Sequence, residues 1–449
     1  MRDLDELTAA EAARLIRARS ISPEDLLLAC LGRIDALEPT VRAFVLLDRE
    51  AALRAARERT REAEEGRGLG ALHGVPVALK DIFDASGLVT TAGAGPFAHR
   101  RASADATSVA RLRAHGAVVV GKVTTTAFAF LDPSPTRNPW NPEHTPGGSS
   151  SGPAAAVAAR MVPLALGSQT VGSVLRPAAF CGVVGLKPTH GRISAAGVVP
   201  LAASTDHVGT FSRSVEDAAL ALGLMAGADP LDPLSSAWPV DDYTRGLADP
   251  PVPRLGLMRS LLARATPEVA AHVEAAARDF AAAGATVVDV ALPASFATVH
   301  EAGNTVVRAE ASAWHRPLYD RHAAEYPPNV RAAIEEGRRY SAVDYLTAQT
   351  ARRRFQDEMA PIAARFDALL SPVAAGPAPK GLESTGDPYF CAPWSFAGMP
   401  ALSIPSGLAG DGLPLAVQLI GGVWAEARLL AAGAWCERVL GFAGAPPRA

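Results

Sequence analysis

Two short segments rich in glycine and serine hold the side chains best suited to covalent chemistry. Residues 147–152 read Gly-Gly-Ser-Ser-Ser-Gly, and residues 167–173 read Gly-Ser-Gln-Thr-Val-Gly-Ser. Glycines let successive backbone N–H groups converge on one point, which is how an oxyanion hole is built, and a serine ending such a run could act as a nucleophile. Such segments are also typical of ordinary turns, so composition alone leaves both interpretations open.

Three generic motifs do not lead to a function. Residues 116–122 fit the phosphate-binding pattern G-x-x-x-x-G-K, but Val123 follows where a magnesium-binding Ser or Thr is needed. Residues 148–152 fit the nucleophile elbow G-x-S-x-G, but the segment before them, 138–142, is a predicted loop instead of a strand. The ten histidines have no metal-binding spacing. The sequence therefore indicates no metal and no cofactor.

Lysine is scarce in this chain. Of 43 basic residues only four are lysine, namely Lys80, Lys122, Lys187 and Lys380. Where arginine is used almost everywhere else, a lysine marks a position at which a compact, titratable amine could matter. Lys80 could act as a base, or it could form a structural ion pair with Asp81 or Asp84. We assign no role to Lys122 or Lys380.

The motifs around these residues resemble the amidase signature family. They include Gly-Val-Pro-Val-Ala-Leu-Lys-Asp at 74–81, Gly-Gly-Ser-Ser at 147–150, Gly-Ser at 172–173, Pro-Ala-Ala-Phe-Cys-Gly-Val-Val-Gly-Leu-Lys-Pro-Thr at 177–189 and Gly-Met-Pro-Ala at 398–401. They follow one another in the family's order over most of the chain. Within the fourth motif, Lys187 is interpreted as structural.

The resemblance implies a Ser-cisSer-Lys triad made of Ser173 as nucleophile, Ser149 as bridging serine and Lys80 as base. In this scheme a neutral Lys80 takes a proton from Ser149 while Ser149 takes one from Ser173. Burial must lower the lysine pKa from its usual value of about 10.4 for this to work. The resemblance also implies a cis peptide bond between Gly148 and Ser149. Alternatively, Ser149 could be a turn residue and Ser173 could cap the turn that follows it.

The same resemblance implies an oxyanion hole from consecutive backbone N–H groups, those of Thr170, Val171, Gly172 and Ser173. The segment departs from the family's commoner pattern, because Gln169 stands where an Asp is usual and the arginine, Arg176, comes three residues after the serine. Both are predicted to bind substrate. Loss of an acid beside a retained guanidinium favours a substrate with a carboxylate near its amide. Arg176 could instead brace the loop.

The predicted function is hydrolysis of a carboxylic amide C–N bond to an acid and ammonia or an amine, through a serine acyl-enzyme. One alternative is the A subunit of a glutamine-dependent tRNA amidotransferase, which passes ammonia to a partner. A second alternative is a non-catalytic scaffold with the same fold. The sequence does not name the amide, although residues 298–366 and 370–396 are expected to line the acyl pocket.

The elements that must position these residues alternate between short apolar strands and helices, which indicates an α/β fold. We predict a single large α/β/α domain over 1–449, with a mixed twisted central sheet covered by helices on both faces. Within it, residues 1–65 form a helical lead-in, residues 70–225 the signature core, and residues 298–366 a helical layer over the sheet. Predicted strands include 75–79, 117–120, 163–166 and 413–420, and the last predicted helix is 426–440.

Composition limits the partners of the chain. It has 449 residues, of which 49% are hydrophobic and 20% charged, as in a folded globular protein. A net charge of −3 gives no electrostatic footprint for nucleic acid or for anionic membrane surfaces. The first 20 residues lack the features of a signal peptide, and four widely spaced cysteines suggest no disulfide framework, so we expect a cytoplasmic protein. The partner is a small-molecule amide; the oligomeric state, a homo-oligomer included, stays open.

Overall fold

The predicted strands assemble into one sheet. The computed structural model describes residues 3–67 and 69–447, so the ends of the predicted 1–449 domain lie outside it. In the described residues the sheet has eleven strands in the order β1-β3-β2-β4-β6-β5-β10-β11-β9-β7-β8. The strands are β1 (Phe44–Leu47), β2 (Pro76–Lys80), β3 (Val118–Val123), β4 (Leu164–Gln169), β5 (Val184–Lys187), β6 (His207–Ser212), β7 (Arg254–Leu257), β8 (Thr286–Asp289), β9 (Ala368–Pro372), β10 (Ala401–Leu408) and β11 (Pro414–Ile420).

The sheet is mixed, as predicted. Strand β2 pairs in parallel with both β3 and β4, and β7 pairs in parallel with β8 and β9. The strands between these two groups, from β6 to β11, are antiparallel to their neighbours. Parallel pairs need a crossover, and helices supply it here, which explains the alternation of strands and helices in the sequence.

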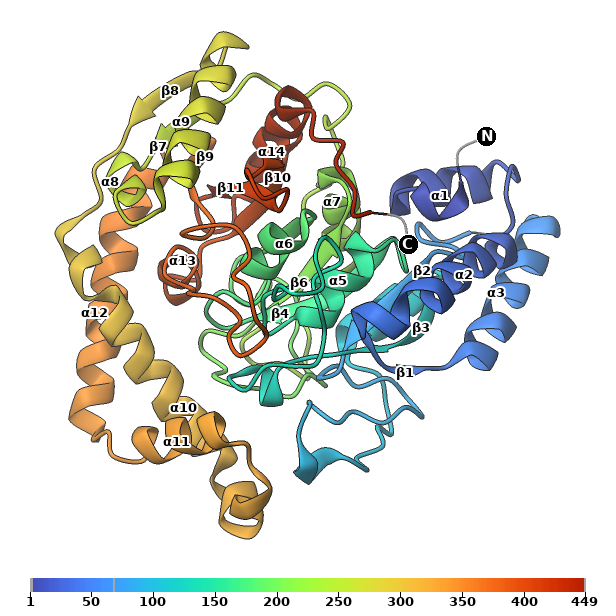
Figure 1. The fold of residues 1–449 in the computed structure, drawn as a ribbon, viewed down its shortest axis with the longest axis horizontal. Helices are drawn as coiled ribbons and strands as arrows, with labels where there is room; N and C mark the ends of the chain where they lie inside the picture. The colour runs from blue at the N-terminus through green and yellow to red at the C-terminus, as the bar shows by residue number, and fades with distance from the viewer. Residues whose placement is uncertain (1–2, 68, 448–449) are drawn as a thin grey trace.

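Helices cover both faces of the sheet (Figure 1). They are α1 (Ala9–Arg17), α2 (Pro23–Val41), α3 (Arg49–Glu64), α4 (Thr107–Ala114), α5 (Ser151–Ala158), α6 (Leu175–Cys181), α7 (Val215–Met225), α8 (Arg259–Leu262), α9 (Pro267–Ala282), α10 (Val299–His322), α11 (Pro328–Gly337), α12 (Ala342–Ala363), α13 (Ala392–Phe396) and α14 (Glu426–Leu440). The last helix has the predicted bounds. The predicted α/β/α fold is therefore confirmed.

Residues of the central strands alternate between two cores. Along β4, Leu164 and Leu166 pack with helices α1, α4 and α7, whereas Ala165 between them packs with α2, α3 and α5. Along β2, Leu79 packs in the same core as Leu164 and Leu166, and Ala78 packs in the same core as Ala165. Because successive side chains of a strand point to opposite faces, a strand covered on both faces reads as a continuous apolar run. That run is the signal that located these strands in the sequence.

One strand interrupts the segment expected to be entirely helical. Residues Phe44–Leu47 form β1, which pairs antiparallel with β3 at the edge of the sheet. The prediction of helices throughout 1–65 is wrong at this point. Helix α2 ends at Val41, and the next residue, Arg42, has a left-handed φ of 55°. The run Phe-Val-Leu-Leu that follows favours a strand.

The long helices near residue 300 extend away from the sheet on the side opposite α1, α2 and α3 (Figure 1). Helix α12 begins with a capping box between Ser341 and Asp344. Phe128, which follows strand β3, packs against His315 and Tyr326 with ring centroids 4.6 and 5.0 Å apart. This aromatic contact holds the far end of α10 against the central part of the molecule.

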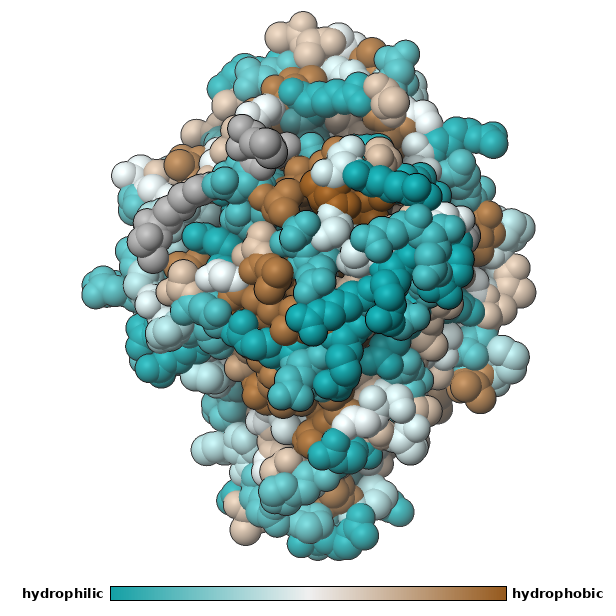
Figure 2. All heavy atoms as spheres, turned by 90° about the vertical axis from the view of Figure 1, so that its right-hand side faces the viewer, coloured by the Kyte–Doolittle hydropathy of each residue, from teal (hydrophilic) through white to brown (hydrophobic). Residues whose placement is uncertain are grey.

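The face over α1, α2 and α3 carries mostly hydrophilic side chains, with hydrophobic ones in separate small areas (Figure 2). Among the described residues, no helix combines the length and the hydrophobicity that crossing a membrane requires.

Candidate active site

Lys80 ends strand β2, which lies between β3 and β4 in the sheet. Its side chain is fully buried. The Nζ atom lies 2.7 Å from Ser149 Oγ and 2.8 Å from Ser168 Oγ. The strand thus brings the amine to the Gly-Ser loop from a position 69 residues earlier in the chain.

The environment of Lys80 favours a neutral amine. No carboxylate of the described residues lies within ion-pairing distance of its Nζ, and burial lowers the lysine pKa well below its usual value. The charge of Asp206 acts in the opposite direction and raises the pKa, but burial has the larger effect. A neutral amine 2.7 Å from a serine hydroxyl can accept its proton.

The loop carrying Ser149 is held by backbone contacts. The peptide bond between Gly148 and Ser149 is cis, as the resemblance implies. Thr126 N donates to Ser149 O at 3.1 Å. Ser150 bonds strand β4 twice, because its Oγ donates to Ser168 O at 3.1 Å and accepts from Ser168 N at 3.3 Å. Ser150 therefore aligns the loop with β4.

Ser173 lies between the end of β4 and the start of α6. Its side chain is only 8% exposed, and no hydrogen bond to its hydroxyl is present within 3–67 and 69–447. Thr170, at the start of the same segment, donates from Oγ1 to Asp206 Oδ1 at 2.6 Å. The segment from Thr170 to Ser173 is therefore anchored at its first residue, and no hydrogen bond in the described residues joins the Ser173 hydroxyl to Ser149.

Gln169 is engaged inside the protein. Its Oε1 accepts hydrogen bonds from the backbone N–H groups of Val174 at 2.8 Å and Leu175 at 3.0 Å, and its Nε2 donates to Ser395 Oγ at 2.8 Å. These bonds satisfy N–H groups at the beginning of α6, which have no partner inside the helix. Contact of Gln169 with a substrate stays a prediction.

Arg176 joins the two loops. Its Nη2 donates to Gly148 O at 2.7 Å and to Thr385 Oγ1 at 3.0 Å. Its side chain is almost completely buried, which lowers the pKa of the guanidinium to about 10. The Nε and Nη1 groups are buried without a partner in the described part of the chain. Arg176 thus braces the loop and still has donors available.

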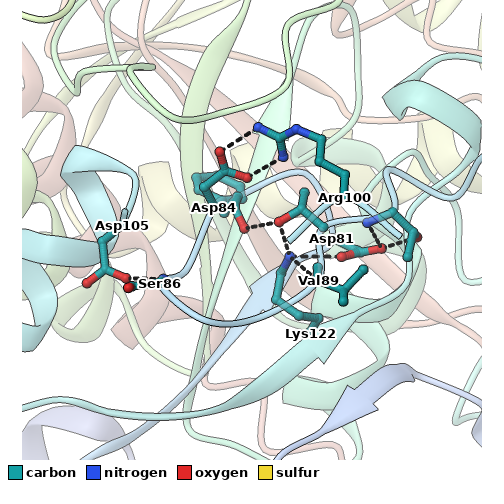
Figure 3. Close-up of polar contacts among 10 residues, drawn as sticks. Asp81, Asp84, Ser86, Val89, Arg100, Asp105 and Lys122 are labelled. Atoms are coloured by element: carbon teal, nitrogen blue, oxygen red, sulfur yellow. Dashed lines mark hydrogen bonds and ion pairs between the residues drawn. The ribbon is translucent and has the colours of Figure 1, made fainter. Parts of the chain in front are cut away.

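The residue after Lys80, Asp81, belongs to a buried ion pair (Figure 3). Lys122 Nζ lies 2.8 Å from Asp81 Oδ1, and both side chains are fully buried. Asp84 forms a two-point contact with Arg100 at 2.6 and 2.7 Å. The alternative in which Lys80 pairs with Asp81 or Asp84 is therefore wrong, because other cations occupy both carboxylates.

The other two lysines lie away from Lys80 and Ser149. Lys187 is buried and donates to the carbonyl oxygen of Met399, and burial lowers its pKa to about 7. Lys380 forms an exposed pair with Glu143 at 3.1 Å. No group of three metal-ligating side chains is present in the described residues.

Sequence reasoning missed Ser168 and gave no role to Asp206. Ser168 lies in β4, where the apolar run ends, and its Oγ lies as close to Lys80 as that of Ser149. A polar residue at the end of a buried strand is the available sequence signal. The contact of Asp206 with Thr170 does not follow from local spacing, because 36 residues separate the two.

Two cavities meet at Thr170. Cavity A has a volume of about 260 Å³ and is lined by residues that include Ile82, Ser168, Thr170, Ile193, Val199 and His207. Cavity B has a volume of about 390 Å³ and is lined by residues that include Thr170, Val171, His300, Asn304, Tyr389 and Phe396. Cavity B is thus formed in part by the two segments expected to line the acyl pocket.

The site thus combines a mixed sheet with a buried lysine that contacts a serine loop and has no ion-pair partner in the described residues. Residues 25–430 match the family described as Amidase. The chain belongs to this family, as the sequence resemblance predicted.

The relatives agree with this assignment. The chain is 38% identical to the A subunit of the glutamyl-tRNA(Gln) amidotransferase from Anaeromyxobacter sp. (strain K), covering 99% of both chains. It is also 38% identical to the putative amidase AmiD of Mycobacterium tuberculosis, over 98% of this chain and 95% of the relative. The structure of the peptide amidase from Stenotrophomonas maltophilia superimposes with a TM-score of 0.85 at 31% identity, over 98% of each chain. The protein is an enzyme that hydrolyses carbon–nitrogen amide bonds.

Proposed function

We propose that Ser173 attacks the amide carbonyl and that Ser149 and Lys80 carry its proton. Lys80 accepts the Ser149 proton as Ser149 accepts that of Ser173, and the Ser173 Oγ–carbon bond forms. The C–N bond then breaks, and the proton returns through Ser149 to the leaving nitrogen. Water repeats the sequence on the acyl-enzyme, which releases the acid and restores Ser173.

The backbone N–H groups of Thr170, Val171, Gly172 and Ser173 are proposed to stabilise the oxyanion of each tetrahedral intermediate. The anchoring of Thr170 through Asp206 supports this role, because an oxyanion hole is effective when its donors are held in place before the reaction.

The observation that carries the proposal is the contact between Lys80 and Ser149. The two atoms are 2.7 Å apart, the amine is fully buried, and burial lowers its pKa. The other two buried lysines differ from Lys80, because Lys122 pairs with Asp81 and Lys187 donates to the carbonyl oxygen of Met399, and neither has a hydrogen bond to a serine hydroxyl in the described residues.

The test is to locate the acyl group. A slow ester substrate should leave its acyl group on the peptide containing Ser173, as detected by mass spectrometry after rapid quenching. Ser173→Ala should remove both adduct and turnover while circular dichroism stays unchanged. An adduct on Ser150 would contradict the proposed nucleophile, and turnover by Ser173→Ala would contradict the whole scheme.

We propose that the substrate carries a carboxylate bound by Arg176. The two buried donors without partners, Nε and Nη1, support this role, since a buried guanidinium is stabilised by an anion. Dicarboxylic monoamides are the corresponding substrate class.

A second candidate is the A subunit of a tRNA amidotransferase, supported by the 38% identity to such a protein. That function needs a partner that receives ammonia. The isolated chain should then hydrolyse glutamine slowly and other amides not at all. Ammonia release from a panel of amides by the isolated chain distinguishes the two functions.

A cytoplasmic location is also part of the proposal. Cys30, Cys181, Cys391 and Cys436 are all buried and free, which suits a reducing compartment.

A further inference from the structure

Cavity A adjoins the proposed site through Ser168, whose Oγ lies 2.8 Å from Lys80 Nζ, although Lys80, Ser149 and Ser173 are not among its lining residues. It reaches strand β4 at Ser168 and Thr170, and apolar side chains such as Ile82, Ile193 and Val199 form most of its wall. An apolar cavity of about 150 Å³ is large enough to bind benzene. At about 260 Å³, cavity A can hold a ring with substituents.

The Asp206 carboxylate of cavity A has its hydrogen-bond partners within the protein. Asp206, which lies in its wall, accepts hydrogen bonds from Thr170 Oγ1 at 2.6 Å, Leu201 N at 2.8 Å and Ala202 N at 3.1 Å. A carboxylate with three donors has little need of a cation from a ligand. No lysine or arginine of the described chain is among the lining residues.

His207 adds no positive charge. Its Nδ1 lies 2.6 Å from Thr205 O and 3.1 Å from Gln169 O, so this nitrogen carries the ring proton and donates it. Burial lowers the pKa of the imidazole well below its usual value.

The other carboxylate of the wall, Asp232, accepts hydrogen bonds from Ala195 N at 2.8 Å and Leu234 N at 2.9 Å, and burial lowers the pKa of the second histidine, His190. With both carboxylates hydrogen-bonded and the pKa of both imidazoles lowered, the cavity favours an uncharged group and excludes a carboxylate.

The position of cavity A assigns it to one side of the scissile bond. The leaving nitrogen must receive its proton from the Lys80–Ser149 pair, so the amine part must lie on the side of Lys80. Ser168, whose Oγ is 2.8 Å from Lys80 Nζ, lines cavity A only, whereas Val171 lines cavity B only. The amine part therefore belongs in cavity A and the acyl part in cavity B.

We propose that cavity A binds the amine part of the substrate and that the enzyme acts preferentially on N-substituted amides whose amine part is bulky, apolar and uncharged. This inference rests on the amide hydrolysis proposed above. Among amides of one acid, it makes the primary amide a poorer substrate than the N-substituted one.

The first test compares amides of one acid that differ only in the amine. N-methyl and N-cyclohexyl amides release amines of similar basicity. A difference in kcat/KM between them therefore reports how well cavity A binds the amine part. We expect the N-cyclohexyl amide to have the higher kcat/KM by about tenfold or more, because burying the ring adds apolar contact. An N-carboxymethyl amide should be no better than the N-methyl amide. Equal rates for methyl and cyclohexyl would overturn the inference and leave the hydrolytic function standing.

A matched pair of variants locates the effect. Ala195 lines cavity A and Ala392 lines cavity B, and both are half-buried. Ala195→Leu should abolish the preference for N-cyclohexyl over N-methyl. Ala392→Leu should keep that preference and instead lower kcat/KM for large acyl groups. The opposite pattern would place the amine part in cavity B and refute the assignment.

Binding without turnover separates the two proposals. Calorimetry with the Ser173→Ala chain should show that the N-cyclohexyl amide binds about tenfold or more tightly than the N-methyl amide, and that adding Ala195→Leu removes the difference. If that result holds while the wild type shows no hydrolysis, the proposed function is wrong and cavity A is still a binding site. Equal binding of the two amides would reject the cavity itself.

Discussion

Arg176 Nη2 donates a hydrogen bond to the carbonyl oxygen of Gly148 at 2.7 Å. The bond links helix α6, which follows Ser173, to the loop that carries Ser149. Two segments that are 28 residues apart in the chain are thereby held together at the site. A single guanidinium positions one loop relative to the other, and its remaining donors face no protein acceptor in the described residues.

Arg176→Ala should separate the two roles of this side chain. Loss of a charge-assisted contact of about 1.5–3 kcal/mol should raise KM for a dicarboxylic monoamide by roughly 10–150-fold. Neutral amides of similar size should be affected much less. Steady-state kinetics on both substrates gives the answer, and equal losses on both would show that Arg176 only braces the loop.

Lys80→Arg should be as inactive as Lys80→Met, although it keeps a positive charge, because a guanidinium does not act as a base at neutral pH. Measured kcat for the two variants against wild type checks this. Near wild-type activity in Lys80→Arg would exclude proton transfer to this residue.

The pH–rate profile should reflect the lowered pKa of Lys80. The base is active when unprotonated, so kcat/KM should rise with pH as Lys80 loses its proton, and the midpoint should lie well below the usual lysine value of about 10.4. Activity is therefore expected at neutral and alkaline pH. A rate that falls steadily above pH of about 7 would contradict a neutral-lysine base.

Ser168→Ala removes one of the two hydroxyls that contact Lys80 Nζ. The loss of a hydrogen bond of about 0.5–1.5 kcal/mol should lower kcat by roughly 2–10-fold, with KM little changed, because the amine is less well positioned. Ser403→Ala is the matched control, since Ser403 is also buried in a strand but its Oγ has no partner in the described residues. A similar loss in both variants would indicate a general packing effect.

Lys122→Met should destabilise the fold by about 3–5 kcal/mol, because it leaves the buried Asp81 carboxylate without its cation. Adding Asp81→Asn should recover part of this loss by removing the charge. Urea unfolding of the single and double variants measures both changes. Lys380→Met breaks only an exposed pair, so it should change the free energy of unfolding by at most about 1 kcal/mol. A Lys122→Met chain as stable as wild type would show that the pair is not a structural element.

The sequence by itself determined part of the strands of the sheet and the candidate triad, whereas β5, β6 and β7 were not predicted. The apolar runs of β2, β3 and β4 are legible because a strand buried on both faces needs apolar residues at every position. Lys80, Ser149 and Ser173 were identified from local motifs. The strand β1 was missed because four apolar residues between two helices carry too little periodicity to distinguish strand from helix.

Only the tertiary structure decided which groups meet and what charge they carry. Ser168 is 88 residues from Lys80, and Asp81 is 41 residues from Lys122, so neither contact follows from local spacing. The choice between base and ion-pair partner for Lys80 depended on which carboxylates already had cations. The protonation of a lysine depends on its burial and on the charges near it, and both are properties of the packed chain rather than of its sequence.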